Sequence, residues 1–342
     1  WRQFALGQNT SRRQFPEWSH DLAWLPDSFG FASGLPAVAN ATGVRWFCTH
    51  KLAWNATNAF PHRLFRWRGR GGAELLALML PGIGTDADPL AMQREQTCFK
   101  AATGVDQALW LPGVGDHGGG PTREMLEEMQ LWDNQPQTVP RRAGTVRAYL
   151  KQLEPLKSSL PVWRDELYLE LHRGCATSRP DQKRHNRTLE RLLREVDLLA
   201  ALGADAAQAR DWPVLLFQQF HDILPGTSIP EVFDQAESQW RVARRRAARA
   251  RTAGVHQLIR RASTADSEAE IGCQRWSWCG LQPLQRWSPL VRLPSGQWRC
   301  EGTNLPSQVA PGGDLWVQLP LAKGVVALPL EWRADAERVS DI

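Results

Sequence analysis

Two acidic residues lie in sequence contexts that favour an exposed carboxylate. Asp27 follows Pro26 in WLPDSFGF, after an apolar run and before a bend that contains glycine, so a strand end would present its side chain to a cleft. Asp116 lies in GVGDHGGGPT, where the glycines let the backbone approach a ligand closely. This loop lacks the G-x-x-x-x-G-K-[ST] pattern, and its carboxylate would repel phosphate, so a sugar is the better ligand. The alternatives are an Asp27 that caps its own turn and a plain surface loop around Asp116.

A histidine and an aspartate stand side by side in LLFQQFHDILPGTSI, residues 215–229. The apolar run before them predicts a helix, and Pro225 with Gly226 stops it, so we expect His221 and Asp222 at a helix end. Charged side chains are uncommon within an apolar run of this kind, because such runs are mostly buried.

The segment THKLAWNATNAFPHRLFRW, residues 49–67, combines imidazoles, amides and indoles, with His50, Trp54 and Asn55 close together. This mixture suits ligands rich in hydroxyl groups, because amides pair with vicinal hydroxyls while aromatic rings cover the apolar face of a sugar. A further cluster at residues 165–187 holds several charged side chains, which surface ion pairs explain without a function.

The elements that would position these residues fall into three zones. Residues 1–125 mix short apolar runs with Gly, Pro and Asn, which predicts the strands and loops of an α/β domain. Residues 263–342 hold short Trp, Val and Leu runs between Pro and Gly, which predicts β-strands. Residues 126–262 are predicted to form a helical bundle, and an apolar stripe at helical spacing indicates its core: Leu189, Leu192, Leu193, Val196 and Leu199.

The composition is that of a globular protein with a net charge of +5. No run of about 18 apolar residues is free of charge, so we expect no membrane span, and the N-terminal segment does not resemble a signal peptide. The six cysteines have no regular spacing, which favours free thiols in a reducing compartment. The run RVARRRAARAR, residues 241–251, is interpreted as a solvated helix face and not as a nucleic-acid site, because no aromatic residues interleave the arginines.

Taken together and in this order, these segments closely resemble glycoside hydrolase family 38, the α-mannosidases, in its cytosolic and bacterial branch. The resemblance implies an α/β catalytic domain, a three-helix bundle and then β-sandwiches, of which residues 263–342 would be the start. It implies hydrolysis of terminal α-mannosides or mannose-containing oligosaccharides in the cytoplasm. The matching blocks span about residues 2–240: WLPDSFGF, THKLAWNATNAFPH, GDHGGGPT, ELYLELHRG, KRHNR and QFHDILPGTSI.

The resemblance also implies a metal site. Asp27 matches the family's nucleophile, which is at the same time a ligand of a divalent metal, zinc or alternatively cobalt. His221 matches a histidine ligand of the same metal, and Asp222 matches a neighbour that binds a sugar hydroxyl. Carboxylate and imidazole ligands suit zinc, and an open coordination position can take the vicinal hydroxyls of mannose.

The implied reaction retains the configuration of the sugar. Asp27 attacks the anomeric carbon to form a covalent glycosyl-enzyme, a second carboxylic acid protonates the departing oxygen, and water later resolves the intermediate. Asp116 is our candidate for that acid, with hydroxyl binding or a structural role as the alternative. His50, Trp54 and Asn55 match family positions near the substrate.

One departure from the family pattern is large. The family supplies two further metal ligands from an H-x-D motif on its first strand, and no such motif precedes Asp27. His20 and Asp21 are adjacent, but we reject them because the family places its motif far earlier. We therefore expect an internal fragment whose α/β domain is incomplete and lacks its first strand. The alternative function is a noncatalytic truncated remnant or a carbohydrate-binding scaffold.

Overall fold

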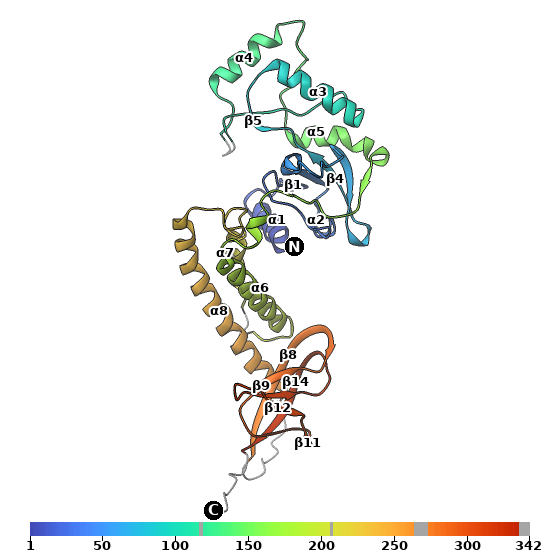
Figure 1. Ribbon diagram of the computed structural model, residues 1–342. Helices are drawn as coiled ribbons and strands as arrows, with labels where there is room; N and C mark the ends of the chain where they lie inside the picture. Colours follow the sequence, from blue (N-terminus) through green and yellow to red (C-terminus); the bar gives the residue numbers. More distant parts are fainter. Residues whose placement is uncertain (116–118, 206–207, 263–272, 335–342) are drawn as a thin grey trace, which may run out of the picture. The chain divides into compact units, whose positions relative to one another are not determined.

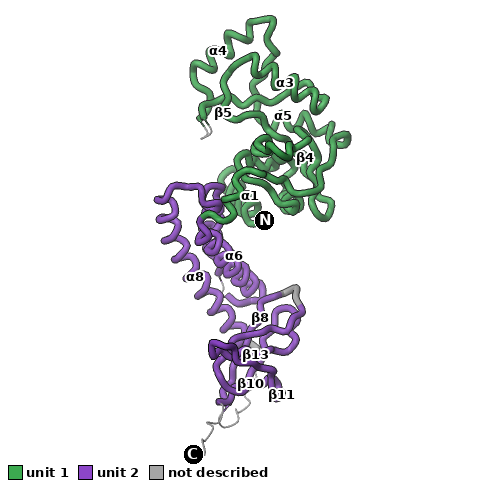
Figure 2. The backbone as a smooth tube through the Cα atoms, in the orientation of Figure 1, with its two compact units in different colours: residues 1–178 green, residues 179–342 purple. Residues whose placement is uncertain are grey.

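The computed structural model describes residues 1–115, 119–205, 208–262 and 273–334. The chain forms two compact units, Trp1–Ser178 and Arg179–Ile342 (Figures 1 and 2). Each unit buries hydrophobic side chains of its own, so each has a separate core.

A five-stranded mixed sheet forms the centre of the first unit. In spatial order its strands are β1 (Leu22–Trp24), β2 (Trp46–Thr49), β4 (Glu74–Met79), β3 (Leu64–Arg68) and β7 (Val162–Trp163). Strands β1, β2 and β4 are parallel, β3 is antiparallel to β4, and β7 is parallel to β3. The carboxyl ends of β1, β2 and β4 therefore meet at one edge, which is where parallel sheets commonly form ligand sites.

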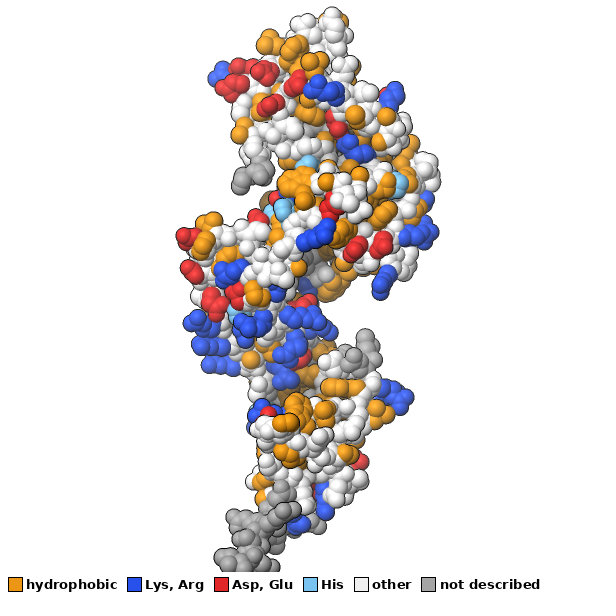
Figure 3. All heavy atoms as spheres, in the orientation of Figure 1, with side chains coloured by type: hydrophobic (Ala, Val, Ile, Leu, Met, Phe, Trp, Pro, Cys, Tyr) orange, Lys and Arg blue, Asp and Glu red, His pale blue; other side chains and the backbone are white. Residues whose placement is uncertain are grey.

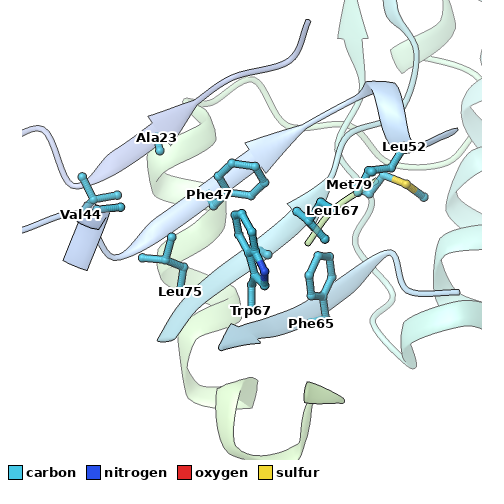
Figure 4. Close-up of a cluster of buried hydrophobic side chains, with 11 residues drawn as sticks. Ala23, Val44, Phe47, Leu52, Phe65, Trp67, Leu75, Met79 and Leu167 are labelled. Atoms are coloured by element: carbon cyan, nitrogen blue, oxygen red, sulfur yellow. The ribbon is translucent and has the colours of Figure 1, made fainter. Parts of the chain in front are cut away.

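Alternating side chains give this sheet two buried faces. In β4, Leu75, Ala77 and Met79 belong to one core, while Leu76 and Leu78 belong to the other. Figure 4 shows the first of these cores, with Leu75 and Met79 along one strand. A strand that is apolar at every position can be buried on both faces, which fits a central place in an α/β sheet.

Helices cover both faces of the sheet, as expected for an α/β domain. Side chains from α1 (Arg2–Gln14) and α2 (Leu35–Asn40) pack in the first core, and side chains from α3 (Pro89–Thr103) and α5 (Val146–Leu153) pack in the second. The remaining elements of this unit are η1 (Lys51–Trp54), η2 (Arg70–Gly72), β5 (Ile83–Thr85), β6 (Leu111–Pro112), α4 (Arg123–Asp133), η3 (Glu154–Ser159) and η4 (Arg173–Ala176).

The second unit begins with the helices α6 (Pro180–Ala201), α7 (Trp212–Phe217) and α8 (Pro230–Ala262). Gln182 of α6 accepts a hydrogen bond from the indole of Trp240 in α8 at 2.8 Å, and both side chains are buried. Helix α7 has only six residues, so α6 and α8 make up most of this part. The predicted apolar stripe of α6 is confirmed, because all of its members are buried: Leu189, Leu192, Leu193, Val196 and Leu199.

The arginine-rich run lies within α8 and takes part in ion pairs. Arg251 pairs with Glu195 of α6, and Arg246 lies 3.4 Å from the carboxylate of Asp211. Figure 3 shows basic side chains gathered over α6 and α8. The run is therefore a helix face with local acidic partners, in agreement with its interpretation from the sequence.

Two β-sheets follow α8. Trp298 and Leu330 from one sheet share a core with Leu315 and Val317 from the other, so the sheets pack face to face, consistent with the start of the expected β-sandwich region. One sheet has the order β11 (Thr303–Asn304), β10 (Gln297–Cys300), β14 (Ala322–Arg333), β8 (Cys273–Trp287), and the other has the order β12 (Ser307–Val309), β13 (Leu315–Gln318), β9 (Leu290–Leu293).

The first compact unit extends to Ser178 because α5 and β7 belong to its core and its sheet. The predicted domain boundaries at residues 125 and 262 stay predictions, since a compact unit need not be one domain. None of the six cysteines, all of which are described, is in a disulfide. Among the described helices, none combines the length and the apolar character needed to span a bilayer.

Candidate active site

Two predicted site residues lie at the same edge of the sheet in the first unit. Asp27 follows β1 and His50 follows β2, and these strands are parallel neighbours. The hydrogen-bond ladder continues past both strands, because Leu25 N donates to Cys48 O at 3.0 Å and His50 N donates to Pro26 O at 3.1 Å. Asp27 is thus held beside the chain that leaves β2.

The short helix η1 gives two side chains a common direction. A 3-10 helix has three residues per turn, so positions i and i+3 align, and the Lys51 Nζ lies 3.4 Å from the centroid of the Trp54 ring. Trp54 Nε1 also donates to His50 Nε2 at 3.3 Å. Leu52 is buried in the first core beside Met79 (Figure 4), which anchors η1 to the sheet.

Lys51 forms an ion pair with Asp27. The Lys51 Nζ is 2.7 Å from Asp27 Oδ1, and the exposed fractions of the two side chains are 10% and 43%. A sheltered ammonium needs a charged or polar partner, while the more exposed carboxylate still reaches solvent. Lys51 was not among the predicted site residues, and its only signal in the sequence is its place within THKLAWN.

His50 is sheltered at the base of this arrangement. Burial lowers the pKa of His50 below its usual value, so the neutral imidazole is favoured. The backbone of Leu80 and of Pro81 opposes part of this lowering by hydrogen bonding to the ring. The predicted contact of His50 with a substrate stays a prediction.

A distant part of the chain is fixed to the segment after η1. Asn55 Nδ2 donates to Tyr168 O at 2.8 Å, and Glu170 N donates to Asn55 Oδ1 at 3.0 Å. The carboxylate of Glu170 accepts from Thr57 N at 2.6 Å and from Asn58 N at 3.3 Å, and these bonds lower the pKa of Glu170. The Asn55 amide therefore binds backbone, and its predicted contact with a sugar stays a prediction.

Three rings gather beside the ion pair. The ring centroids of Phe29 and His172 are 4.7 Å apart, and those of Trp54 and His172 are 5.9 Å apart. His172 has a φ of 64°, which is uncommon for a residue with a Cβ, so these neighbours hold a costly backbone conformation. Trp54 is 40% exposed, and an exposed indole ring suits contact with the C–H face of a sugar ring.

The loop that contains Asp116 follows β6. Asp116 lies outside the described residues, so its role stays a prediction. The residues before and after it in the chain are joined by a hydrogen bond, in which Val114 N donates to Gly119 O at 3.1 Å. Gly84 in β5 has a φ of +69°, and a Cβ at that position would lie 2.1 Å from Gly115 O. The absence of a side chain at Gly84 therefore lets the backbone of Gly115 lie directly against β5.

His221 and Asp222 lie in a turn of the second unit. Helix α7 ends at Phe217, earlier than the predicted stop at Pro225, and turns follow it. Asp222 O accepts from Thr227 N and from Ser228 N at 3.0 Å each, and Thr227 Oγ1 donates to Asp222 Oδ1 at 2.7 Å. These bonds close a turn where helical bonds were expected. His221 Nε2 lies 3.7 Å from Asp222 Oδ2.

Helix α6 braces this turn. Lys183 Nζ donates to Pro225 O at 2.9 Å, and Gln219 Nε2 donates to Asn186 Oδ1 at 2.9 Å. Lys183 and Asn186 belong to the KRHNR block, so two of the sequence blocks meet in space. Surface ion pairs were the explanation expected from the sequence for the charged residues of this cluster, and the hydrogen bond from Lys183 to the turn was not predicted.

The described residues do not form a complete metal centre. Nowhere in the described ranges do three or more His, Cys, Asp or Glu side chains form a group that could hold a metal. Asp27 belongs to the first unit and His221 to the second. The donor types of these two residues suit zinc, but a structural or catalytic zinc site uses three or four protein ligands.

Two family profiles match the chain in order. Residues 1–166 match the profile described as the glycosyl hydrolases family 38 N-terminal domain, and residues 170–258 match the one described as the alpha mannosidase middle domain. Among curated proteins, Alpha-mannosidase 2C1 of Homo sapiens is 36% identical over 251 residues, which cover 69% of this chain and 24% of that protein. An alpha-mannosidase of Saccharomyces cerevisiae is 34% identical over 253 residues, covering 68% of this chain and 23% of that protein.

The fold also resembles solved structures. An alpha-mannosidase from Enterococcus faecalis V583 superposes with a TM-score of 0.69 at 14% identity, covering 97% of this chain and 46% of that one. A protein in glycosyl hydrolase family 38 from Enterococcus faecalis gives a TM-score of 0.59 at 12% identity, covering 95% and 40%. The chain thus spans about a quarter of the length of the curated relatives named above.

Proposed function

The chain belongs to glycoside hydrolase family 38, and we propose that it is part of a retaining α-mannosidase that hydrolyses terminal α-mannosides. The observation that carries the proposal is the consecutive match of residues 1–166 and 170–258 to two domains of that family, together with the similarity to α-mannosidases of animals and yeast. We place the protein in the cytoplasm, with a mannose-containing oligosaccharide as substrate.

In the first half of the proposed reaction, a carboxylate oxygen of Asp27 attacks the anomeric carbon. The bond from that carbon to the departing oxygen breaks, and Asp116, acting as the acid, donates a proton to this oxygen. In the second half, water attacks the anomeric carbon, the ester bond to Asp27 breaks, and the proton of the water returns to Asp116. The exposure of Asp27 at the carboxyl edge of β1 supports the role of nucleophile, because a ligand can reach it.

The aromatic rings near Asp27 would bind the sugar. The exposed part of the Trp54 ring would lie against the apolar side of the mannose ring, and His50 and Asn55 are proposed to take part in binding. Asp222 would accept a hydrogen bond from a sugar hydroxyl. An aromatic face combined with a few polar groups both orients the ring and excludes water from the reacting bond.

A divalent metal, zinc or cobalt, is part of the proposal, with Asp27 and His221 among its ligands. When bound, such a metal would supply a template that orients vicinal hydroxyls of the sugar. These two residues are fewer than a zinc site needs, so ligands beyond those described are required.

The second candidate function is a noncatalytic remnant or carbohydrate-binding scaffold. The observation that favours it is that the described residues bring no set of three metal ligands together. Such a protein would keep the sugar-binding surface around Trp54 without turnover.

The experiment that separates the two uses the complete natural reading frame that contains this chain. Hydrolysis of a chromogenic α-mannoside and metal content are measured for the wild type, for Asp27→Asn and for Asp106→Asn, a surface aspartate whose side chain is 69% exposed. An α-mannosidase cleaves the substrate with about one metal per site, loses turnover in Asp27→Asn and keeps it in Asp106→Asn. Absence of both metal and cleavage in the wild type establishes the remnant instead.

A further inference from the structure

The Lys51 side chain is a sheltered charged group in contact with the proposed nucleophile. Its ammonium lies 2.7 Å from Asp27 Oδ1 and 3.4 Å from the centre of the Trp54 ring, and its side chain is only 10% exposed. We propose that Lys51 is a positioning residue that acts through Asp27 and drives the second half of the reaction, the release of the sugar from Asp27. This inference rests on the proposed function of Asp27.

The geometry restricts both members of the pair. Leu52 is buried in the core next to Lys51, so η1 cannot swing away from the sheet. The indole face of Trp54 covers the ammonium on one side, which is a favourable place for a cation and keeps water from it. The ammonium is therefore held beside Oδ1 of Asp27, which fixes the rotation of the carboxylate.

The charge balance changes between the two halves of the reaction. Before attack, Asp27 is an anion beside the sheltered Lys51 and, in the proposed function, beside a divalent metal as well. After attack the carboxylate has become a neutral ester, and the Lys51 cation has lost its contact with that negative charge. When water adds to the anomeric carbon, the ester C–O bond breaks, its electron pair returns to the carboxylate, and the pair with Lys51 is restored. Lys51 therefore disfavours the covalent intermediate and favours its breakdown.

Removal of the charge should have opposite consequences for the two halves. A neutral side chain at position 51 no longer destabilises the ester, and it no longer stabilises the departing carboxylate. The covalent intermediate should then accumulate, because breakdown slows while formation is less affected. Loss of a hydrogen bond to a charged group predicts that breakdown slows by about 10- to 100-fold.

The test compares Lys51→Met with Lys51→Arg in the complete reading frame, with dinitrophenyl α-mannoside as the substrate. This substrate has a good leaving group, so formation of the intermediate is fast. For Lys51→Met we expect kcat and KM to fall together by about 10- to 100-fold, kcat/KM to change by less than about threefold, and a mannosyl adduct to appear in the intact protein mass. Lys51→Arg keeps the cation and should keep kcat within about tenfold of the wild type.

A matched control is Lys100→Met, because the Lys100 ammonium lies 2.5 Å from Asp106 and both side chains are more than half exposed. It should leave kcat, KM and the protein mass unchanged. Metal content of Lys51→Met is measured beside activity, and it should equal that of the wild type, which shows that the change is not a loss of metal.

Two results overturn the inference while the proposed function stands. The first is that kcat and kcat/KM of Lys51→Met fall in parallel and no mannosyl adduct forms. The second is that kcat, KM and the protein mass of Lys51→Met equal those of the wild type. In both cases the wild type is active and Asp27→Asn is inactive. If Lys51→Met does not fold, Lys51→Gln takes its place, and failure of both to fold assigns Lys51 to the fold instead. An inactive wild type or an active Asp27→Asn overturns the proposed function itself.

Discussion

Replacement of Gly84 by alanine tests how the loop around Asp116 is held. A Cβ at position 84 would lie 2.1 Å from Gly115 O and 2.8 Å from the carbonyl carbon of that residue. Carbon and oxygen atoms in contact keep about 3.3 Å or more between them, so Gly115 must retreat by about 1 Å. The φ of +69° adds a cost of about 1 to 2 kcal/mol for any residue with a Cβ.

Gly104 offers a matched control for this substitution. Its φ is +74°, close to that of Gly84, but a Cβ there would meet no atom within 4 Å. Gly104→Ala therefore has the same backbone cost, about 1 to 2 kcal/mol, without displacing the loop. The difference between the two variants isolates the displacement.

Chemical denaturation and hydrolysis of an α-mannoside are measured for both variants in the complete reading frame. With Asp116 as the proposed acid, a misplacement of about 1 Å costs about 100-fold in rate, so Gly84→Ala should lose about that factor in kcat/KM, and Gly104→Ala should stay within about twofold of the wild type. Equal activity in Gly84→Ala and Gly104→Ala would refute the reasoning that Gly84 fixes a loop needed for catalysis.

Three further predictions concern single side chains. The pKa of Glu170 is lowered by its bond from Thr57 N, so its contribution to stability is present above the ordinary carboxyl pKa and is lost as pH falls through the lowered value. Glu170→Gln should therefore melt below the wild type at pH 7 and approach it below about pH 4; a gap independent of pH contradicts this. Lys183→Met removes the hydrogen bond from Lys183 to the turn that carries the His-Asp pair. It should lower the free energy of unfolding by about 1 kcal/mol and the activity by at least about tenfold. Similar losses in Gln182→Glu would say nothing about this role of Lys183, whereas unchanged activity in Lys183→Met would contradict it. Leu193→Ala should lower the free energy of unfolding by about 2 to 5 kcal/mol, because Leu193 is fully buried. Its control, Leu202→Ala at an exposed position, should lower it by about 0.5 kcal/mol. Equal losses in the two variants, measured by denaturation, would refute the assignment of Leu193 to the core.

Local patterns in the sequence predicted the elements well where a single period dominates. The apolar spacing of Leu189 to Leu199 predicted the buried face of α6, because a helix repeats every 3.6 residues and α8 covers one side. The end of α7 was predicted too late, because an apolar run such as LLFQQF is compatible with either a helix or a series of turns. The side-chain and backbone bonds of Asp222 decide that choice, and they join residues that a periodic pattern does not relate.

The structure brings some of the candidate site residues together, and their roles stay predictions. Asp27 and His50 were chosen as candidates from their segments, and the parallel pairing of β1 with β2 places both at one edge of the sheet. Lys51 was missed, because a lysine next to a histidine in sequence gives no sign that it faces a carboxylate 24 positions away. Asn55 was expected to meet a sugar, yet its amide bonds to Tyr168 O, a contact that depends on the tertiary fold.

The bonds that join Asn55 and Thr57 to Glu170 have a consequence for synthesis on the ribosome. These partners are 113 to 115 positions apart, so the segment after η1 cannot be fixed until residue 170 has left the exit tunnel. The sheet neighbours β1, β2, β3 and β4 are all complete by Met79 and can pair long before that. The nascent chain therefore carries an early sheet while the segment after η1 is not yet fixed, and exposed rings such as Trp54 are available to chaperones during that interval.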